Sequence, residues 1–399
     1  MTLYIKNNLI KIFIFYCLII IENNLQKYSF KYHPFYLPHK QSILSLNKSK
    51  INELERGRIF LDKCLISKKS KKYKKIKKPK LSVILPLYNC QKIIRASLNS
   101  IIFQNMANIE IILINDFSND NTLKIIKNFK RYDQRIMLIN NKKNMGTLYS
   151  RSIGVLKAKG EYIFSLDNDD MYFNYDILGT IYKRIIQESL DIIGFLTVNL
   201  WNYTASINKM KNIFTYLYPD EFYLEQPELR RWMIKFKGKY LVHNNMIWDK
   251  CIKSLIYKKA LNIMGYNRYS NYLSWAEDTS ILFIIFNLAK SFKYIYKYGI
   301  LHFKGNITSS LTQSIDTKIF GEIFFLDILY TFSKNNTEDK NLIVGQAYYI
   351  YNRYNISSYL NTSNRFYLKS TLIKIINCNY LSNLNRRKIT KLFRTFFIY

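Results

Sequence analysis

Residues 81–89 read LSVILPLYN, residues 109–116 read IEIILIND, and residues 162–170 read YIFSLDNDD. Each stretch opens with a short, mostly apolar run that contains β-branched residues and ends in polar ones. Short apolar runs of this kind predict buried strands. A run at residues 136–139 has the same character. The sequence therefore predicts four short strands, three of which lead directly into a polar turn.

Helix-length stretches separate these runs, at residues 91–103, 122–132 and 145–158, and Gly160 stands at a helix-stop position after the last of them. Alternating strands and helices predict an α/β domain with a mostly parallel sheet and helices on both faces. Neither a GxGxxG nor a Walker A sequence follows the first strand, so the dinucleotide-binding and P-loop versions of this architecture are not indicated.

The rest of the chain divides by composition. Residues 1–21 contain an apolar stretch after Lys6 and predict a signal peptide or signal anchor, with a buried N-terminal element as the alternative. We interpret residues 22–80 as a basic stem or linker, because nine of the last thirteen are lysine. The α/β domain is expected over residues 81–310, followed by a helical C-terminal extension over residues 311–399.

The chain is strongly basic, with 61 Lys and Arg against 27 Asp and Glu and a formal net charge of +34. Such a charge favours polyanionic partners or anionic membranes. The abundant Ile, Asn, Lys, Tyr and Phe all have AT-rich codons, so base composition explains part of the excess. A nucleic-acid-binding or membrane-binding basic protein without catalytic activity is therefore the alternative to an enzyme.

Polar residues after the predicted strands should meet at one edge of the sheet, where open α/β sheets bind ligands. The most charged of these turns contains Asp167, Asp169 and Asp170. Three carboxylates so close together repel one another unless a cation is present. Oxygen ligands with room for phosphate oxygens suit Mg²⁺ or Mn²⁺. An exposed acidic turn that caps the next helix is the structural alternative.

These motifs together resemble the family 2 glycosyltransferases, which have the GT-A fold. The resemblance rests on Pro-x-Tyr-Asn at 86–89, on the loop containing Asp116, on Leu-Asp-x-Asp-Asp at 166–170 and on Glu-Asp at 277–278. It covers about residues 81–310. It implies a GT-A type, Rossmann-like sheet and an inverting transfer of sugar from a nucleoside-diphosphate sugar.

The resemblance also assigns the nucleotide-binding residues. Tyr88 would lie against the base, Asp116 would accept a hydrogen bond from it, and UDP is the expected nucleotide. Arg151 would supply a fixed charge near the phosphates or base. The full set expected to bind the nucleotide sugar is Pro86, Tyr88, Asn89, Asp116, Asn144, Arg151 and Asp167.

The same resemblance implies a metal site and a general base. Asp169 would be the main ligand of Mn²⁺ or Mg²⁺, assisted by Asp167 and Asp170. Asp278 would take the proton from the acceptor hydroxyl, with a helix N-cap as its structural alternative. The family usually has Asp-Asp where this chain has Asn115-Asp116.

The implied partners are a UDP-sugar donor and a glycan, protein or lipid acceptor, with membrane attachment through the N-terminus and no nucleic acid. The predicted signal would place the protein in the secretory pathway, in the ER or Golgi lumen. A nucleotidyltransferase could use a similar sheet with paired aspartates, but it would need a Gly-rich loop after the first strand, which the chain lacks.

Overall fold

The fold is described from a computed structural model. The described residues are 39–41, 52–53, 56–57, 59–61, 63–64, 73–201, 213–217, 221–230, 235–236, 239–240, 246–266, 273, 275–304, 314–332, 337–354, 367–373, 387 and 389–390. The predicted signal at residues 1–21 lies outside them and stays a prediction. Within the described part of the chain, no helix is both long and apolar enough to cross a membrane.

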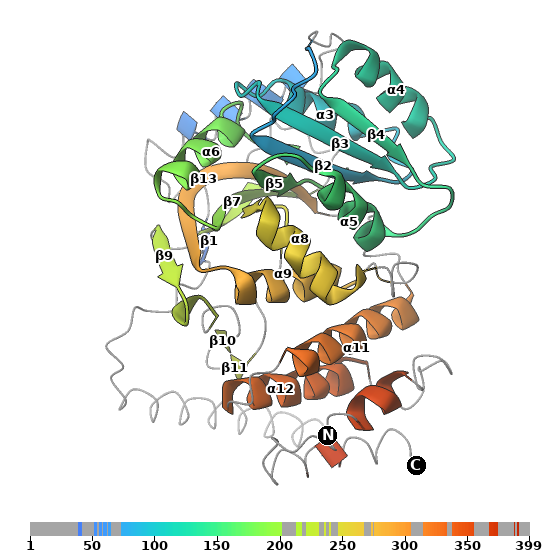
Figure 1. The fold of residues 1–399 in the computed structure, drawn as a ribbon, viewed down its shortest axis with the longest axis vertical. Helices are drawn as coiled ribbons and strands as arrows, with labels where there is room; N and C mark the ends of the chain where they lie inside the picture. Colours follow the sequence, from blue (N-terminus) through green and yellow to red (C-terminus); the bar gives the residue numbers. More distant parts are fainter. Residues whose placement is uncertain are drawn as a thin grey trace, which may run out of the picture. The chain divides into compact units, whose positions relative to one another are not determined.

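The strands and helices follow one another as the sequence predicts through residue 166, and further elements come after them (Figure 1). The strands are β1 (His39–Gln41), β2 (Leu81–Leu87), β3 (Ile109–Asn115), β4 (Ile136–Asn140), β5 (Tyr162–Ser165), β6 (Met171–Tyr172), β7 (Ile192–Trp201), β8 (Ile213–Leu217), β9 (Phe222–Glu225), β10 (Lys235–Phe236), β11 (Lys239–Tyr240), β12 (Lys250–Lys253) and β13 (Ser291–Lys304). The helices are α3 (Ile94–Ile102), α4 (Thr122–Tyr132), α5 (Thr147–Lys157), α6 (Ile177–Gln187), α8 (Ser254–Met264), α9 (Glu277–Leu288), α11 (Ile315–Thr331) and α12 (Thr337–Tyr354).

The four strands predicted from the apolar runs lie side by side and are all parallel. Strand β2 pairs with β3 on one side and β5 on the other, and β3 pairs with β4. Their carboxyl ends therefore meet at one edge, as a parallel sheet requires. The predicted α/β class is confirmed.

Antiparallel strands extend the sheet beyond β5. Strand β12 lies between β5 and β7 and is antiparallel to both. The long strand β13 runs parallel to β7 and antiparallel to β6, the short strand that follows the aspartate turn. Elements far apart in sequence thus reach the same edge as the aspartates.

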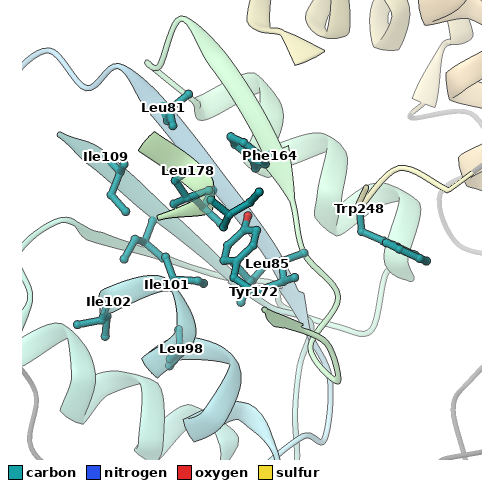
Figure 2. Packing of buried hydrophobic residues seen from close by; sticks show 14 of the residues in the cluster. Leu81, Leu85, Leu98, Ile101, Ile102, Ile109, Phe164, Tyr172, Leu178 and Trp248 are labelled. Carbon is teal, nitrogen blue, oxygen red and sulfur yellow. The ribbon is translucent and has the colours of Figure 1, made fainter. Parts of the chain in front are cut away.

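Helices cover both faces of the parallel strands. Leu81, Leu85 and Ile109 pack in one hydrophobic cluster with residues of α3, α4 and α6 (Figure 2). Residues one position along the strands point the other way, as the two-residue period of a strand demands. Gly154 of α5 lies against Ile84 there, so closely that a Cβ would stand 2.6 Å from the Ile84 side chain.

The packed domain begins before Leu81. Phe60 and Cys64, within the predicted stem, are buried in the same cluster as the strands. The Asn99 side chain donates a hydrogen bond of 2.8 Å to the Cys64 carbonyl. At the other end, α11 and α12 lie within the predicted helical extension. Phe325 of α11 meets Phe283 of α9 edge to face, with 6.1 Å between ring centroids.

Gly160 is expected to be the least replaceable glycine of the parallel sheet. A Cβ at this position would stand 2.5 Å from the backbone nitrogen of Ser82, and backbone cannot rotate away. Gly160→Ala should therefore lower the free energy of unfolding by about 2 kcal/mol, measured by urea titration.

Gly179→Ala is the matched control, because its Cβ would meet mainly the end of the Asn105 side chain, at 2.9 Å. Alanine is also favoured over glycine inside a helix. The control should cost clearly less, and equal losses for both variants would contradict the close approach at Gly160.

Candidate active site

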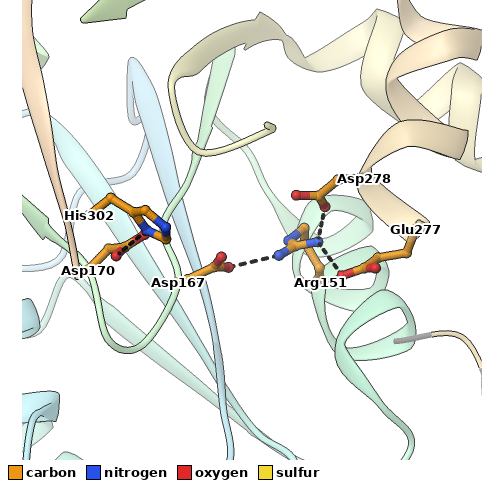
Figure 3. Close-up of polar contacts among 6 residues, drawn as sticks. All are labelled: Arg151, Asp167, Asp170, Glu277, Asp278 and His302. Atoms are coloured by element: carbon orange, nitrogen blue, oxygen red, sulfur yellow. Dashed lines mark hydrogen bonds and ion pairs between the residues drawn. The ribbon is translucent and has the colours of Figure 1, made fainter. Parts of the chain in front are cut away.

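The aspartate turn after β5 forms the centre of the candidate site (Figure 3). Asp170 is fully buried, and Nδ1 of His302 lies 3.0 Å from one of its carboxylate oxygens. His302 comes from β13 and stacks on Trp248, with 4.8 Å between ring centroids. Asp167, at the other end of the turn, is about one third exposed and contacts Arg151. The two outer carboxylates of the turn therefore each have a basic partner.

Arg151 of α5 connects the aspartate turn to the Glu-Asp motif. Its Nη2 donates to Asp167 at 2.8 Å, and its Nη1 donates to Asp278 at 2.6 Å. Glu277 lies 3.9 Å from the same Nη1. The guanidinium side chain is only 3% exposed. Burial alone would lower the pKa of Arg151, but Asp278 and Asp167 outweigh it, so the pKa is raised and the charge is permanent.

Asp169 lies between the two paired aspartates and makes no hydrogen bond to another described residue's side chain or backbone. Burial, followed by the charges of Asp170 and Asp167, raises the pKa of Asp169 to about 7. A carboxylate that is costly to ionise and surrounded by others fits a hard divalent cation, which would supply the missing positive charge. Among the described residues, no three His, Cys, Asp or Glu side chains already converge in the arrangement of a metal site.

Asp278 stands in the first turn of α9, with Glu277 before it. Burial raises the pKa of Asp278 above its ordinary value, while Arg151 and the backbone N–H of Ile247 act in the opposite direction. Burial and the neighbouring Asp278 also raise the pKa of Glu277. A carboxylate with a raised pKa accepts a proton more readily near neutral pH, as a general base must.

The loops after β2 and β3 are joined by reciprocal hydrogen bonds. The Asn89 backbone N–H donates to the Ser118 hydroxyl at 3.1 Å, and the Asn119 N–H donates to Oδ1 of Asn89 at 3.0 Å. Asn89 and Phe117 both have positive φ, 45° and 61°. Tyr88 follows the buried strand end at Pro86 and Leu87 and is 45% exposed. The Pro-x-Tyr-Asn turn is thus fixed in place while its aromatic ring stays accessible.

Asp116 fixes a third loop at the same edge. Its carboxylate accepts hydrogen bonds from the N–H groups of Met145 and Gly146, both at 2.8 Å, and from the Asn141 side chain at 2.7 Å. The Asn144 side chain accepts a further hydrogen bond from Gly146 at 3.1 Å. The expected contact of Asp116 with a nucleobase stays a prediction, because the described contacts are all within the chain.

All the predicted site residues lie at the carboxyl edge of the parallel strands or on the elements that contact it. Asp167, Arg151 and Asp278 are in direct contact, whereas Tyr88 and Asn89 belong to the neighbouring loops. Sequence reasoning gave no role to His302, whose pairing with Asp170 depends on β13 reaching β6. No local signal marks this histidine.

The sequence pattern of Glycosyl transferase family 2 matches residues 82–242. Among proteins with similar sequences, glycosyltransferase GlyG of Streptococcus pneumoniae is 29% identical over 160 residues, which are 40% of this chain and 51% of GlyG. Glycosyltransferase GlyA of the same species is 38% identical over 113 residues, 28% of this chain and 16% of GlyA. The chain thus spans about half, or less, of the length of these relatives.

A similar solved structure is S. aureus TarS 1–349 in complex with UDP-GlcNAc. It matches with a TM-score of 0.53 and 16% identity over 79% of this chain and 90% of that one. At this identity the match supports the GT-A fold alone. The predicted resemblance to the family 2 glycosyltransferases is confirmed over residues 82–242, where the family pattern matches, and the solved structure agrees in fold.

Asp116→Asn should loosen the loop that Asp116 holds. An amide has one acceptor oxygen where the carboxylate has two, so Met145 and Gly146 cannot both keep their hydrogen bonds to it together with Asn141. Hydrogen exchange at these two amides should become about tenfold faster or more.

Asp120→Asn is the matched control, since Asp120 accepts from the N–H groups of Gln91 and Thr122 and has no contact with the Asp116 loop among the described hydrogen bonds. It should leave exchange at residues 145–146 unchanged. Unchanged exchange in Asp116→Asn would contradict the anchoring role.

Proposed function

We propose that this protein transfers a sugar from a UDP-sugar to an acceptor hydroxyl with inversion, using Asp278 as the general base and a divalent cation held at Asp169. The observation that carries the proposal is the buried Arg151, which contacts Asp167 of the aspartate turn and Asp278 of the Glu-Asp motif at once. In an inverting transfer the diphosphate leaves from one side of the anomeric carbon and the hydroxyl attacks from the other. The aspartate turn would face the diphosphate, and the Glu-Asp motif would face the hydroxyl.

The donor would lie along the carboxyl edge of β2 and β3. Tyr88 offers an accessible ring for stacking on a base. Asp116 directly follows the neighbouring strand β3, and its backbone N–H donates to the Leu87 carbonyl at 2.8 Å. The solved complex of TarS with UDP-GlcNAc, a protein of similar fold, supports a uridine nucleotide as the donor. Asp167 and Arg151 would border the diphosphate.

The residues that would hold Mn²⁺ or Mg²⁺ are Asp169, with Asp167 or Asp170 beside it. Such cations usually take one or two carboxylates together with substrate phosphates, so one unpaired carboxylate and two partly engaged neighbours suffice. When bound, the cation would neutralise the charge that develops on the departing diphosphate. Its binding would also keep Asp169 ionised, against the burial that raises its pKa.

Asp278 would remove the acceptor proton as the new bond forms. The acceptor oxygen attacks the anomeric carbon, the bond from that carbon to the diphosphate oxygen breaks, and the hydroxyl proton passes to the Asp278 carboxylate. Attack opposite to the leaving group inverts the anomeric centre and needs no covalent enzyme intermediate. Arg151 binds one oxygen of Asp278 and thereby fixes the orientation of the other.

The alternative, a basic binding protein without catalysis, accounts for the net charge of +34 but not for the buried contacts among Arg151, Asp167 and Asp278. Burying charges costs free energy that pairing only partly offsets, and buried charge clusters are common at functional sites. The match of residues 82–242 to a glycosyltransferase family also favours the enzyme. The expected secretory localisation and membrane attachment stay predictions.

Calorimetric titration of the full chain with UDP and with GDP, each with Mn²⁺ or with EDTA, tests the proposal directly. UDP should bind only with Mn²⁺, and Asp169→Ala should weaken that binding about tenfold or more. Asp278→Asn should bind UDP within about twofold of wild type. With water as the acceptor, it should release UDP from UDP-GlcNAc by hydrolysis at least about 100-fold more slowly.

The absence of binding to either nucleotide would overturn the proposed donor class. If Asp278→Asn released UDP at the wild-type rate, Asp278 would not be the general base, whereas the donor assignment would stand. Asn keeps an acceptor oxygen for Arg151, and Asp167 and Glu277 remain as its charged partners, so the variant should still fold. Circular dichroism of each variant checks this.

The rate of UDP release should also depend on pH through Asp278. A general base works when it is deprotonated, so raising the pH through its pKa increases the rate. An ordinary Asp has a pKa of about 3.9, and burial raises the pKa of Asp278 above that value. In a pH profile of kcat/KM at saturating Mn²⁺, the acid limb should therefore lie clearly above pH 4. An acid limb at or below pH 4 would contradict this assignment.

A further inference from the structure

The residues before Asp278 adopt a backbone conformation that they do not favour on their own. Ala276 has a φ of 59°, in the left-handed region, and directly precedes helix α9. A residue with a Cβ stays in this region only when its surroundings enforce it. The Ala276 carbonyl accepts hydrogen bonds from the backbone N–H and the hydroxyl of Ser280, at 3.0 and 2.9 Å. The strained residue thus starts the helix that presents Asp278.

The C-terminal helix α11 contacts this strained segment directly. The indole Nε1 of Trp275 donates a hydrogen bond of 3.0 Å to Oε1 of Glu322. Gly321 lies so close to the Trp275 carbonyl that a Cβ there would stand 2.1 Å from the oxygen. One turn of α11 therefore contacts both the side chain and the backbone of Trp275.

Helix α12 contributes a second hydrogen bond to Glu322. The Gln346 side chain donates to Oε2 of Glu322 at 2.8 Å, and Glu322 is only 7% exposed. The two carboxylate oxygens of Glu322 thus have separate donors from two different parts of the chain. A buried carboxylate bound in this way has a fixed position. Its partner Trp275 is fixed as a result.

These contacts form a continuous series from the C-terminal helices to the site. Gln346 holds Glu322, Glu322 holds Trp275, and Trp275 leads through Ala276 into the turn where Asp278 meets Arg151 at 2.6 Å. A displacement of α9 by 1 Å would break the last of these hydrogen bonds. Catalysis tolerates very little displacement of a reacting group.

We propose that Glu322 is a positioning residue, and that α11 and α12 hold Asp278 in its working orientation through the hydrogen bond between Glu322 and Trp275. The proposal rests on the proposed function in that Asp278 is taken as the general base. It gives the C-terminal extension, for which the sequence offers no chemistry, a role in the reaction. Nucleotide binding, on the opposite side of Arg151, should not depend on this contact.

The test uses full-length variants that remove the hydrogen bond from either side. Trp275→Phe removes the N–H and keeps an aromatic ring, while Glu322→Ala removes the acceptor. The rate of UDP release from UDP-GlcNAc with Mn²⁺ should fall at least tenfold in each, with the Kd for UDP within twofold of wild type. The double variant should lose no more than the worse single variant, because both remove the same contact.

Glu322→Gln is the conservative control. Its amide oxygen can still accept from Trp275, and Gln346 can rotate its own amide to offer an oxygen to the new NH₂ group. This variant should release UDP within threefold of wild type. Equal rates in wild type, Trp275→Phe and Glu322→Ala would overturn the proposal, and so would a loss of UDP affinity in parallel with rate.

Hydrogen exchange separates failure of this proposal from failure of the proposed function. The amides of Ser280 and Ile281, near the start of α9, should exchange faster in Trp275→Phe and Glu322→Ala, with or without substrate. A wild-type chain that releases no UDP from UDP-GlcNAc, combined with this faster exchange, would count against that donor and leave the positioning contact supported. Unchanged exchange in both variants would overturn the positioning contact.

Discussion

A single buried guanidinium determines how the site is arranged. A charge that is nearly excluded from water must be paired, and removing one partner leaves the others uncompensated. Arg151 has its partners on two other elements, Asp167 after β5 and Asp278 at the start of α9. Since α5 is packed closely on β2 and β3, this pairing fixes the start of α9 relative to the parallel sheet. The aspartate turn and the Glu-Asp motif are therefore held around one side chain.

Much of the parallel part of the sheet was predictable because its signals are local. Strands β2, β3 and β5 are short apolar runs, and the polar residues that follow them meet at one edge as the parallel order requires. The pairing of Asp170 with His302 could not be predicted, since it depends on β13 returning antiparallel to β6. The register of that return is set by packing rather than by any local pattern.

The limits of the domain were also beyond sequence reasoning. A lysine-rich stretch predicts a solvated linker, yet Phe60 and Cys64 before it are buried with the sheet. Two apolar residues a helical turn apart are too few to give a periodic signal. In the same way, Glu322 has no neighbour in sequence that reveals its contact with Trp275. In both cases the contact is with residues far away in the sequence, and the neighbouring sequence does not indicate it.

The hydrogen bonds among the edge loops have a kinetic consequence. Asn89, Ser118 and Asn119 bind one another, and Asp116 holds Met145 and Gly146, through hydrogen bonds within the chain. Loops that are already ordered lose little conformational entropy when they bind a ligand. Association of a ligand at this edge should then be governed by diffusional encounter and charge attraction rather than by loop closure, so that differences in affinity among ligands arise from their dissociation rates.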